Sequence, residues 1–481
     1  MPTTAPLPTG ASENLYEAVA DRVAWLIDNE TLRPGDRIPS VRKMRAQMGV
    51  SISTVMQAYR LLEHRGIVEA RPQSGYYVRR SAGKTLEEPT AARPKKAPRK
   101  VNIASLSYSL MEKLNNPAFV KLGAAVSDIE EMPVTALNRM MGRVLRNHPN
   151  AAHVYDGPMG CERLRVEIAR RMLDAGVAVG PEEIVTTCGA TEALYLALLS
   201  VTEPGDTVAI ETPTYYGILE KLESLHLKSL EMPTDPRDGI DVGAVDRAMA
   251  ERRIQAVVTV SNFGNPLGSR MPEDRKKALA EGAAKWGIPI IEDDIHGELF
   301  FEGRRPRAVK AYDVDDGVIY CSSFSKTISP GCRAGWCIAG RYLEGVVRRK
   351  LAITHSSPTP TQMAVAAYLR SGVFDRHLRR IRKFYRTQVD CVTRAVGRYF
   401  PEGTRASNPQ GGHVLWVEMP EGIDSLGLHD EAARRGISVA PGPLFSPIGQ
   451  YRNCVRLNCG IAWTPAVEAA VKVLGELAKG C

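Results

Sequence analysis

The sequence predicts a two-domain chain, with a large α/β domain built on a mostly parallel sheet and a smaller N-terminal domain of helices and one β-hairpin. With 481 residues, the chain is too long for one ordinary hydrophobic core. Residues 101–481 alternate short β-branched runs with helical stretches, as a parallel α/β sheet requires. Residues 12–79 alternate helical periodicity with a short β signal. Two different folds are therefore expected, one on each side of residues 80–100.

The composition narrows the class of protein. Apolar residues make up 44% of the chain and aromatic residues 6%, which is typical of a soluble globular protein. The nine cysteines lack the short paired spacings of a zinc site, and their odd number argues against a disulfide framework. The first residues do not resemble a signal peptide, and no apolar run is long enough to span a bilayer. We therefore expect a cytoplasmic protein with no metal site and no membrane association.

The net charge of +9 is concentrated near the N-terminus. Residues 1–100 hold 17 basic and 10 acidic residues, a net charge of +7, which leaves +2 for the rest of the chain. Such a local excess indicates contact with a polyanion, although a solvated charged surface explains charge alone at least as well. Residues 80–100 lack apolar periodicity and are interpreted as a linker, and only secondarily as a phosphate-contacting arm. The basic residues at its end are Arg93, Lys95, Lys96, Arg99 and Lys100.

Three helices are predicted in the N-terminal region. The apolar face of the first helix consists of Leu15, Val19, Val23, Leu26 and Ile27. Ser40 is a suitable N-cap for a second helix, which Gly49 can end in the left-handed conformation. A short turn leads to a third helix, for which Ser51 or Ser53 would be the N-cap. The third helix is expected to bury Val55, Ala58, Tyr59 and Leu62.

A β-hairpin is predicted after the third helix. Ile67–Arg71 and Tyr76–Arg79 can pair around a turn in which Gly75 supplies a positive φ. Helix, helix, turn, helix and hairpin in this order form a winged helix-turn-helix. The candidate DNA contacts of the third helix and its cap are Ser51, Ser53, Thr54, Gln57 and Arg60. The candidate contacts outside that helix are Arg42 and Lys43 in the second helix, and Arg71 and Ser74 in the wing.

Residues 34–78 resemble the DNA-binding domain of the GntR superfamily of regulators. The turn, both of its helices and the wing occur in the family's order. The resemblance implies that residues 12–79 bind double-stranded DNA. The alternative is a three-helix interaction module, because a helix-turn-helix pattern alone is common.

In the large domain, a lysine follows a strand that ends in small hydroxyl residues. The predicted strands are Ile184–Thr187, Thr207–Glu211, Ala256–Val260, Pro289–Asp293 and Val318–Ser322. Lys326 follows the last of them, and its amine is a candidate for a Schiff base. Ser323, Ser325 and Arg333 offer two hydroxyls and a guanidinium to one phosphate. A solvated surface lysine is the alternative interpretation.

A second anion site is predicted where a strand turns into a helix after Thr187. The backbone N–H groups of Ala190 and Thr191 would lie at the N-terminus of that helix, where anions bind readily. A glycine at such a turn is weak support by itself, because strand–helix turns with glycine are common.

Three more polar residues follow predicted strands. Asp293 ends an apolar strand and can keep a pyridine nitrogen protonated, although Asp293 or Asp294 could instead be a helix cap. The amide of Asn265 can reach a ring hydroxyl, although an Asn-Pro turn explains it as well. Tyr215 can stack on a ring or lie in the core. Together these groups meet the needs of pyridoxal 5′-phosphate (PLP), and all follow strand ends where ligands of α/β sheets bind.

The order of these motifs resembles the fold-type I aminotransferases of class I/II over most of residues 101–481. The resemblance implies the PLP-dependent transferase fold, with Lys326 as the Schiff-base lysine, Asp293 as the ring-nitrogen partner and Asn265 as the ring-hydroxyl partner. It also implies a ring stacker, Tyr215, and a phosphate cradle of Ala190, Thr191, Ser323, Ser325 and Arg333.

The same resemblance implies two further contacts and shows one departure. Tyr155 looks like the tyrosine that reaches the phosphate of the neighbouring subunit, and Arg456 looks like the arginine that grips a substrate carboxylate. His296 stands where the family often has a tyrosine, three residues after Asp293. A histidine can donate a hydrogen bond to the ring hydroxyl, but it titrates near neutrality. The departure leaves the efficiency of transamination open.

The two halves together resemble the MocR family of PLP-dependent regulators, which implies a homodimer and two DNA half-sites. We expect a transcription regulator that senses an amine or amino-acid effector through Schiff-base exchange at Lys326. One alternative is an active PLP-dependent aminotransferase that also binds DNA. Another is an enzyme with a structural N-terminal module that never meets DNA.

Overall fold

The computed structural model describes residues 15–28, 31–32, 35–65, 67–71, 74–78, 86–92, 94, 97–103, 107–108, 116 and 118–480. The chain forms two compact units, Met1–Thr85 and Leu86–Cys481, called here the N-terminal unit and the large unit. Within the described ranges, none of the helices combines the length and the hydrophobicity needed to cross a bilayer.

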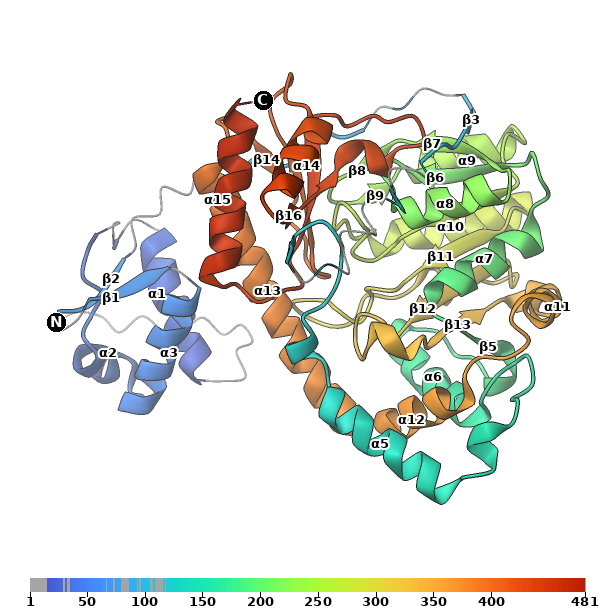
Figure 1. Cartoon of the computed structure of the whole chain (residues 1–481), viewed down its shortest axis with the longest axis horizontal. Coiled ribbons are helices and arrows are strands. Elements are labelled where there is room, and N and C mark those ends of the chain that lie inside the picture. Colours follow the sequence, from blue (N-terminus) through green and yellow to red (C-terminus); the bar gives the residue numbers. More distant parts are fainter. Residues whose placement is uncertain are drawn as a thin grey trace. The chain divides into compact units, whose positions relative to one another are not determined.

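In its described residues the N-terminal unit contains three helices and a hairpin in the expected order (Figure 1). The helices are α1 (Leu15–Asp28), α2 (Val41–Met48) and α3 (Ile52–His64). The antiparallel strands β1 (Val68–Arg71) and β2 (Gly75–Val78) form the wing. Ser51 is the N-cap of α3, because its hydroxyl accepts a hydrogen bond from the Thr54 N–H at 3.1 Å. The unit is therefore a winged helix-turn-helix.

The core of this unit lies between α1 and α3. The fully buried side chains include Val19, Val23, Val55, Tyr59 and Leu62. Leu15, which the sequence places on the apolar face, is the first residue of α1 and is 68% exposed. Gly49 and Gly75 have φ values of 64° and 106°, the left-handed region expected for both.

The large unit is built on an eight-stranded sheet (Figure 1). Its strands, in spatial order, are β3 (Arg99–Lys100), β7 (Lys228–Met232), β6 (Thr207–Glu211), β10 (Ala256–Thr259), β11 (Ile290–Asp293), β12 (Val318–Ser323), β13 (Gly335–Ile338) and β5 (Ile184–Thr187). The strands from β7 to β12 are parallel, whereas β3 and β13 run antiparallel to their neighbours. The five predicted strands are all present, while β3, β7 and β13 were not predicted.

Helices cover both faces of this sheet, and the strand sequences show why. Val208 and Ile210 pack into one core with α7 (Ala190–Val201) and α8 (Tyr216–Ser224), whereas Ala209 between them packs into the other. That other core contains α9 (Val242–Ala250) and α10 (Glu273–Trp286). Successive side chains of a strand point to opposite faces, so the apolar runs are buried on both sides.

Further helices pack at the end of the large sheet that β5 and β13 form, or beside it. They are α5 (Val134–Asn147), α6 (Glu162–Met172), α11 (Leu343–Ile353) and α12 (Thr359–Arg370). Side chains of α6 and α12 share a core with Ile184 of β5 and Trp336 of β13. Two small pairs complete the strands, β8 (Thr234–Asp235) with β9 (Gly239–Ile240), and β4 (Val120–Lys121) with β16 (Ile437–Ser438).

A second, antiparallel sheet follows in the sequence. Its strands, in order, are β14 (Arg405–Ala406), β15 (Val414–Glu418), β18 (Cys454–Asn458) and β17 (Ala440–Pro441). The long helix α13 (Val373–Tyr399) leads into it, and α14 (Ser425–Arg434) and α15 (Pro465–Gly480) pack with it (Figure 1).

Part of the expected linker lies against the large unit. The Thr90 N–H donates to Glu418 Oε2 at 2.8 Å, and the Ala406 N–H donates to the Glu87 carbonyl at 3.0 Å. Arg99 pairs with Ser229 at the edge of the large sheet. Polar and backbone hydrogen bonds hold this segment, and apolar periodicity cannot reveal them. The other predicted linker residues, 80–85 with Arg93, Lys95 and Lys96, lie outside the described residues, as does Arg79 of the predicted wing.

The burial of Leu62 in α3 predicts how much a substitution there destabilises the N-terminal unit. Leu62→Ala is expected to lower its free energy of unfolding by about 2–5 kcal/mol, because a fully buried leucine leaves a cavity. Leu61→Ala, at the half-buried neighbouring position, is the matched control and should cost less. Hydrogen exchange of the N-terminal unit measures both changes, and equal losses would contradict the packing.

Candidate functional site

A pocket of about 210 Å³ lies where the parallel strands of the large sheet end. It brings together predicted cofactor residues from the ends of five strands, which are Ala190, Thr191, Tyr215, Asn265, Asp293, His296, Ser323, Ser325, Lys326 and Arg333. The fold explains why these residues lie together, because the carboxyl ends of adjacent parallel strands lie at one edge of a sheet.

Lys326 lies three residues after β12 and lines the pocket. Its Nζ donates a hydrogen bond to the Ala125 carbonyl at 2.5 Å. Burial, and then the positive charge of Arg456, lower the pKa of Lys326 to about 8, while Asp293 opposes the shift. A lower pKa makes more of the amine available as a neutral nucleophile near neutral pH.

Asp293 is the carboxylate of the pocket. It is 3% exposed, and its Oδ1 accepts a hydrogen bond from the Ile295 N–H at 3.2 Å. Burial raises the pKa of Asp293 to about 7, and the Ile295 N–H and the charge of Lys221 oppose the rise. The neighbouring Asp294 belongs to a separate buried network, in which it accepts hydrogen bonds from Tyr320 at 2.7 Å and from Asn262 at 2.9 Å.

Groups suited to hold an anion gather around Gly189. Gly189 precedes α7 with φ 84°, and a Cβ there would lie 2.6 Å from Arg333 Nη2. The glycine thus leaves room for the guanidinium, which donates to the Cys188 carbonyl at 2.7 Å. The first N–H groups of α7 have no acceptor within the helix. Together with the hydroxyls of Ser323 and Ser325, they form a suitable phosphate cradle.

His296 is buried and neutral. Its Nδ1 lies 3.1 Å from the Phe263 carbonyl, which can only accept, so Nδ1 carries the proton. Its Nε2 is buried, and among the described residues it has no partner. Burial lowers the pKa of His296 to about 3, so the expectation that it titrates near neutrality is wrong. In this tautomer Nε2 accepts a hydrogen bond and does not donate one.

Arg456 lies beside the pocket and is fully buried on β18. Its Nη1 donates to Asn265 Oδ1 at 3.2 Å, and its Nη2 donates to the Gly123 carbonyl. Its Nε is buried without a partner among the described residues. Arg456 therefore orients the pocket residue Asn265 and keeps one spare donor.

Tyr155 is the predicted site residue that lies apart from the pocket. It is 80% exposed, and its ring contacts the His355 ring at 5.0 Å between centroids. Its predicted contact with a neighbouring subunit stays a prediction.

Sequence reasoning missed several residues of the site. Ala124, Ala125 and Val126 close the pocket, and small apolar residues give no chemical signal. Tyr216 lines the pocket beside Tyr215. His413 is fully buried, stacks on Tyr385 at 4.9 Å and meets the His296 ring at 5.4 Å. The sequence QGGH at 410–413 gives no chemical signal that would single out His413.

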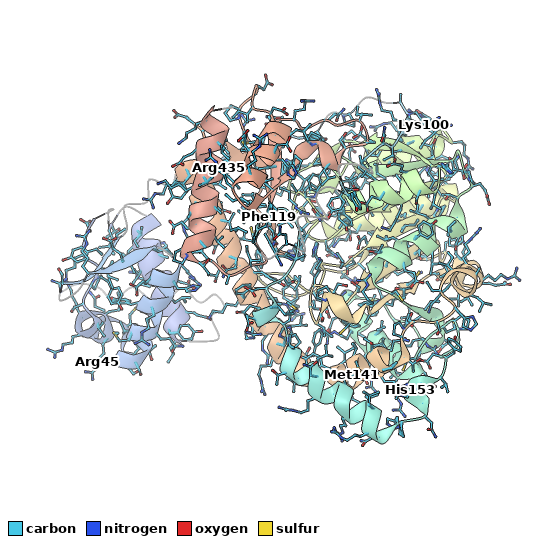
Figure 2. All side chains as sticks on the ribbon, in the orientation of Figure 1. Arg45, Lys100, Phe119, Met141, His153 and Arg435 are labelled. Carbon is cyan, nitrogen blue, oxygen red and sulfur yellow. The ribbon has the colours of Figure 1, made fainter. Side chains whose placement is uncertain are left out.

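Most of the predicted DNA contacts are exposed on the N-terminal unit. The exposed ones are Arg42, Lys43, Ser51, Ser53, Gln57, Arg60 and Arg71, and Thr54 and Ser74 are half-buried. Arg71 Nη2 lies 2.7 Å from Glu69 Oε1, and Arg71 Cζ lies 4.4 Å from the centroid of the Tyr77 ring. Part of the Arg71 side chain is therefore already in contact with other residues of the wing. Figure 2 also shows Arg45 of α2, which was not predicted, at the surface of this unit. The exposed face of α3 is suited to a DNA groove.

The fold and the pocket define an aminotransferase-like domain that is preceded by a winged helix-turn-helix. Residues 120–470 match the family described as aminotransferase class I and II, and residues 15–78 match the bacterial regulatory proteins of the gntR family. The crystal structure of the Pyrococcus horikoshii kynurenine aminotransferase in complex with PMP is similar, with 27% identity and a TM-score of 0.73. The similarity covers 78% of this chain and 94% of that one.

Two Escherichia coli proteins are similar over almost the whole chain. The uncharacterized HTH-type transcriptional regulator YjiR is 38% identical over 96% of this chain and 98% of its own length. The uncharacterized HTH-type transcriptional regulator YdcR is 37% identical over the same shares. The chain belongs to this family of MocR-type regulators, in which a GntR helix-turn-helix domain is fused to a class I and II aminotransferase domain.

The buried Asp293 predicts a pH dependence of stability in the absence of cofactor. Its pKa is about 7 in the folded chain against an ordinary 3.8, so the folded state holds the proton more tightly. Stability from this group is complete below about pH 4 and is lost as the pH rises to about 7, by up to about 4 kcal/mol. Asp293→Asn should lose correspondingly less than the native chain over this range. Urea unfolding at several pH values measures the difference, and parallel curves would contradict the assignment.

Proposed function

We propose that this chain is a DNA-binding transcription regulator whose large unit binds PLP and senses an amine or amino acid at Lys326. The observation that carries the proposal is the meeting of Lys326 and Asp293 in one pocket of a chain whose full-length relatives are named HTH-type regulators. Residues 12–79 act as the DNA-binding domain and residues 101–481 as the PLP-binding domain. The protein acts in the cytoplasm as a homodimer on two half-sites.

The pocket fits PLP by the chemistry of its donors. The Lys326 amine would hold the aldehyde, Asp293 the ring nitrogen, and Tyr215 one face of the ring. The phosphate would lie between Arg333, the two serines and the N-terminus of α7, where Gly189 keeps the space open. Asn265 and His296 would face the ring hydroxyl. When bound, PLP supplies an aldehyde that combines reversibly with amines and a ring that withdraws electrons.

Lys326 and Arg456 would have different roles in sensing. Lys326 would hold the aldehyde of PLP, for which an incoming amine would compete, and as a free amine its Nζ donates a hydrogen bond to the Ala125 carbonyl at 2.5 Å. Arg456 lies buried beside the pocket, and its Nε has no partner among the described residues, so a carboxylate that reached it would favour an amino acid as the effector. A 100-fold response of DNA affinity requires about 2.7 kcal/mol of differential binding between two states.

The second candidate function is an active aminotransferase that also binds DNA. The full set of Lys326, Asp293, Asn265 and Tyr215 favours it. The tautomer of His296 favours sensing, because its Nε2 could only accept a hydrogen bond from a ring hydroxyl, whereas a tyrosine at this position could donate one. Steady production of an oxo acid from an amino acid and an oxo-acid acceptor would identify the chain as an enzyme.

Lys326 is expected to carry the cofactor. The purified chain with PLP should show an absorbance band between about 300 and 500 nm that borohydride fixes, with the label on the peptide of Lys326. Lys326→Ala should lack the fixed label. Absence of the band in the native chain after addition of PLP would mean that the domain has lost its cofactor.

The same variant tests sensing. The DNA affinity of the native chain should change when an effective amine, found by the shift of the absorbance band, is added. The affinity of Lys326→Ala should not change. A normal response of the variant would disprove sensing through Lys326.

The exposed face of α3 is expected to recognise DNA. Arg60→Ala and Gln57→Ala should each weaken binding to the upstream DNA of the chain's own gene by about 5- to 150-fold, the range for one base contact. Arg22→Ala is the matched control, since Arg22 lies on α1 over the Trp25 ring at 4.6 Å. Gel shifts at fixed salt measure the three affinities. No binding by the native chain would favour a structural module, and equal losses at Arg60 and Arg22 would contradict recognition by α3.

A further inference from the structure

Two loops bring the residues suited to a ring hydroxyl to the pocket. The β10 loop (residues 260–265) carries Asn265, the β11 loop (residues 294–297) carries His296, and both side chains line the pocket. In the described part of the chain, two hydrogen bonds join these loops. One connects two side chains, and the other runs from the His296 ring to a backbone carbonyl. These two bonds therefore determine how the loops lie relative to each other.

Asp294 is the fixed end of the first bond. Its Oδ1 accepts from Asn262 Nδ2 at 2.9 Å, and its Oδ2 accepts from Tyr320 at 2.7 Å and from Arg305 at 3.1 Å. The Asp294 N–H donates to the Cys321 carbonyl of β12 at 2.9 Å. Both the backbone and the carboxylate of Asp294 are thus held against β12, and one carboxylate oxygen is presented to the β10 loop.

Asn262 is the other end of this bond, and its amide is held on both sides. The side chain is fully buried, and its Oδ1 accepts from Lys276 Nζ of α10 at 2.8 Å. A carboxylate only accepts hydrogen bonds and an ammonium only donates them, so the amide must direct its oxygen to Lys276 and its nitrogen to Asp294. An amide is the group that fits between these two partners.

The next residue, Phe263, has an unfavourable backbone conformation. Its φ is 57°, in the left-handed region that bulky residues rarely adopt. Such a conformation persists only where the surroundings hold it, and Phe263 is held on both sides. Asn262 is fixed by its side chain, and the Gly264 N–H donates to the Ser269 carbonyl at 3.0 Å. In this conformation the Phe263 carbonyl lies 3.1 Å from His296 Nδ1.

The Phe263 carbonyl is the one hydrogen-bond partner of the His296 ring among the described residues. The His413 ring packs edge-on at 5.4 Å between centroids, but no hydrogen bond joins the two rings. A neutral imidazole carries one proton, so an acceptor at Nδ1 leaves Nε2 without it. The position of this single carbonyl therefore decides whether Nε2 of His296 accepts or donates.

We propose that Asn262 is a positioning residue, which through its bond to Asp294 holds the Phe263 carbonyl against His296 and so selects the tautomer that the pocket presents. Asn262 does not line the pocket and acts through Phe263. The inference deepens the proposed function and rests on it for its consequence, since the tautomer sets how the pocket would bond to the ring hydroxyl of PLP.

The test reads the tautomer of His296 in the full chain without PLP, by NMR of the imidazole nitrogens in protein labelled with ¹⁵N-histidine. The chain has nine histidines, and His296→Gln identifies the signals of His296 by their loss. The native chain should carry the proton on Nδ1. In Asn262→Ala, Phe263 can leave the left-handed region and take its carbonyl away. The ratio of the tautomers should then move about 2- to 12-fold toward protonated Nε2, the weight of one hydrogen bond.

Tyr320→Phe is the matched control. It removes a hydrogen bond from the other oxygen of the same carboxylate and leaves the bond between Asn262 and Asp294 in place. It should lower stability without moving the tautomer ratio. If Asn262→Ala does not fold, Asn262→Ser takes its place, because the shorter hydroxyl side chain cannot span the same two partners.

The outcomes separate the positioning role from the proposed function. A native tautomer ratio in the Asn262 variant, an equal shift in Tyr320→Phe, or a proton on Nε2 in the native chain would each overturn the role of Asn262 and leave PLP binding untouched. A shift in the Asn262 variant alone would establish that role. Absence of borohydride labelling at Lys326 would overturn the proposed function, and with it the consequence for PLP, while the NMR result would still decide what Asn262 does.

Discussion

The burial of a carboxylate at the carboxyl end of β11 is the constraint on which the site depends. Asp293 is 3% exposed, so its charge must be stabilised by neighbours or given up. The Ile295 N–H, and then the charges of Lys221 and Lys326, favour its carboxylate form. The parallel sheet makes this arrangement possible, because it brings consecutive strand ends to one edge while its faces are covered by helices. The chemistry and the fold are therefore difficult to change separately.

The sequence predicted the elements whose signals are local. The five strands after which the site residues lie are apolar and β-branched, and the caps Ser40 and Ser51 stand next to amphipathic helices. Strands β3 and β13 were missed for a physical reason. Each runs antiparallel at or near an edge of the parallel sheet, β3 has only two residues, and β13 has four residues that begin with a glycine, so neither shows a run of β-branched residues.

The candidate site divides in the same way. Residues that follow strands, such as Lys326 and Asn265, could be placed from the motif, and the structure brings them into one pocket. The protonation states of the site residues could not be predicted from the sequence, because they depend on burial in the folded chain. His296 was expected to titrate near neutrality, yet a completely buried ring beside positive charge stays neutral. The stacking of His413 on Tyr385 joins two separate segments of the chain, and no local pattern predicts it.

The segment before the large sheet also limits where a DNA-binding domain can be joined to a large unit of this kind. Residues 86–92 and β3 precede residues 101–481, the predicted PLP-binding domain. Thr90, Glu87 and Arg99 nevertheless form hydrogen bonds with the two sheets of that domain. A fragment that begins at residue 101 would lose β3 and expose the backbone groups of β7 as a free sheet edge, which favours aggregation. Exchange of DNA-binding heads between related regulators, in the laboratory or by gene fusion, should therefore conserve function best when the junction lies before Leu86.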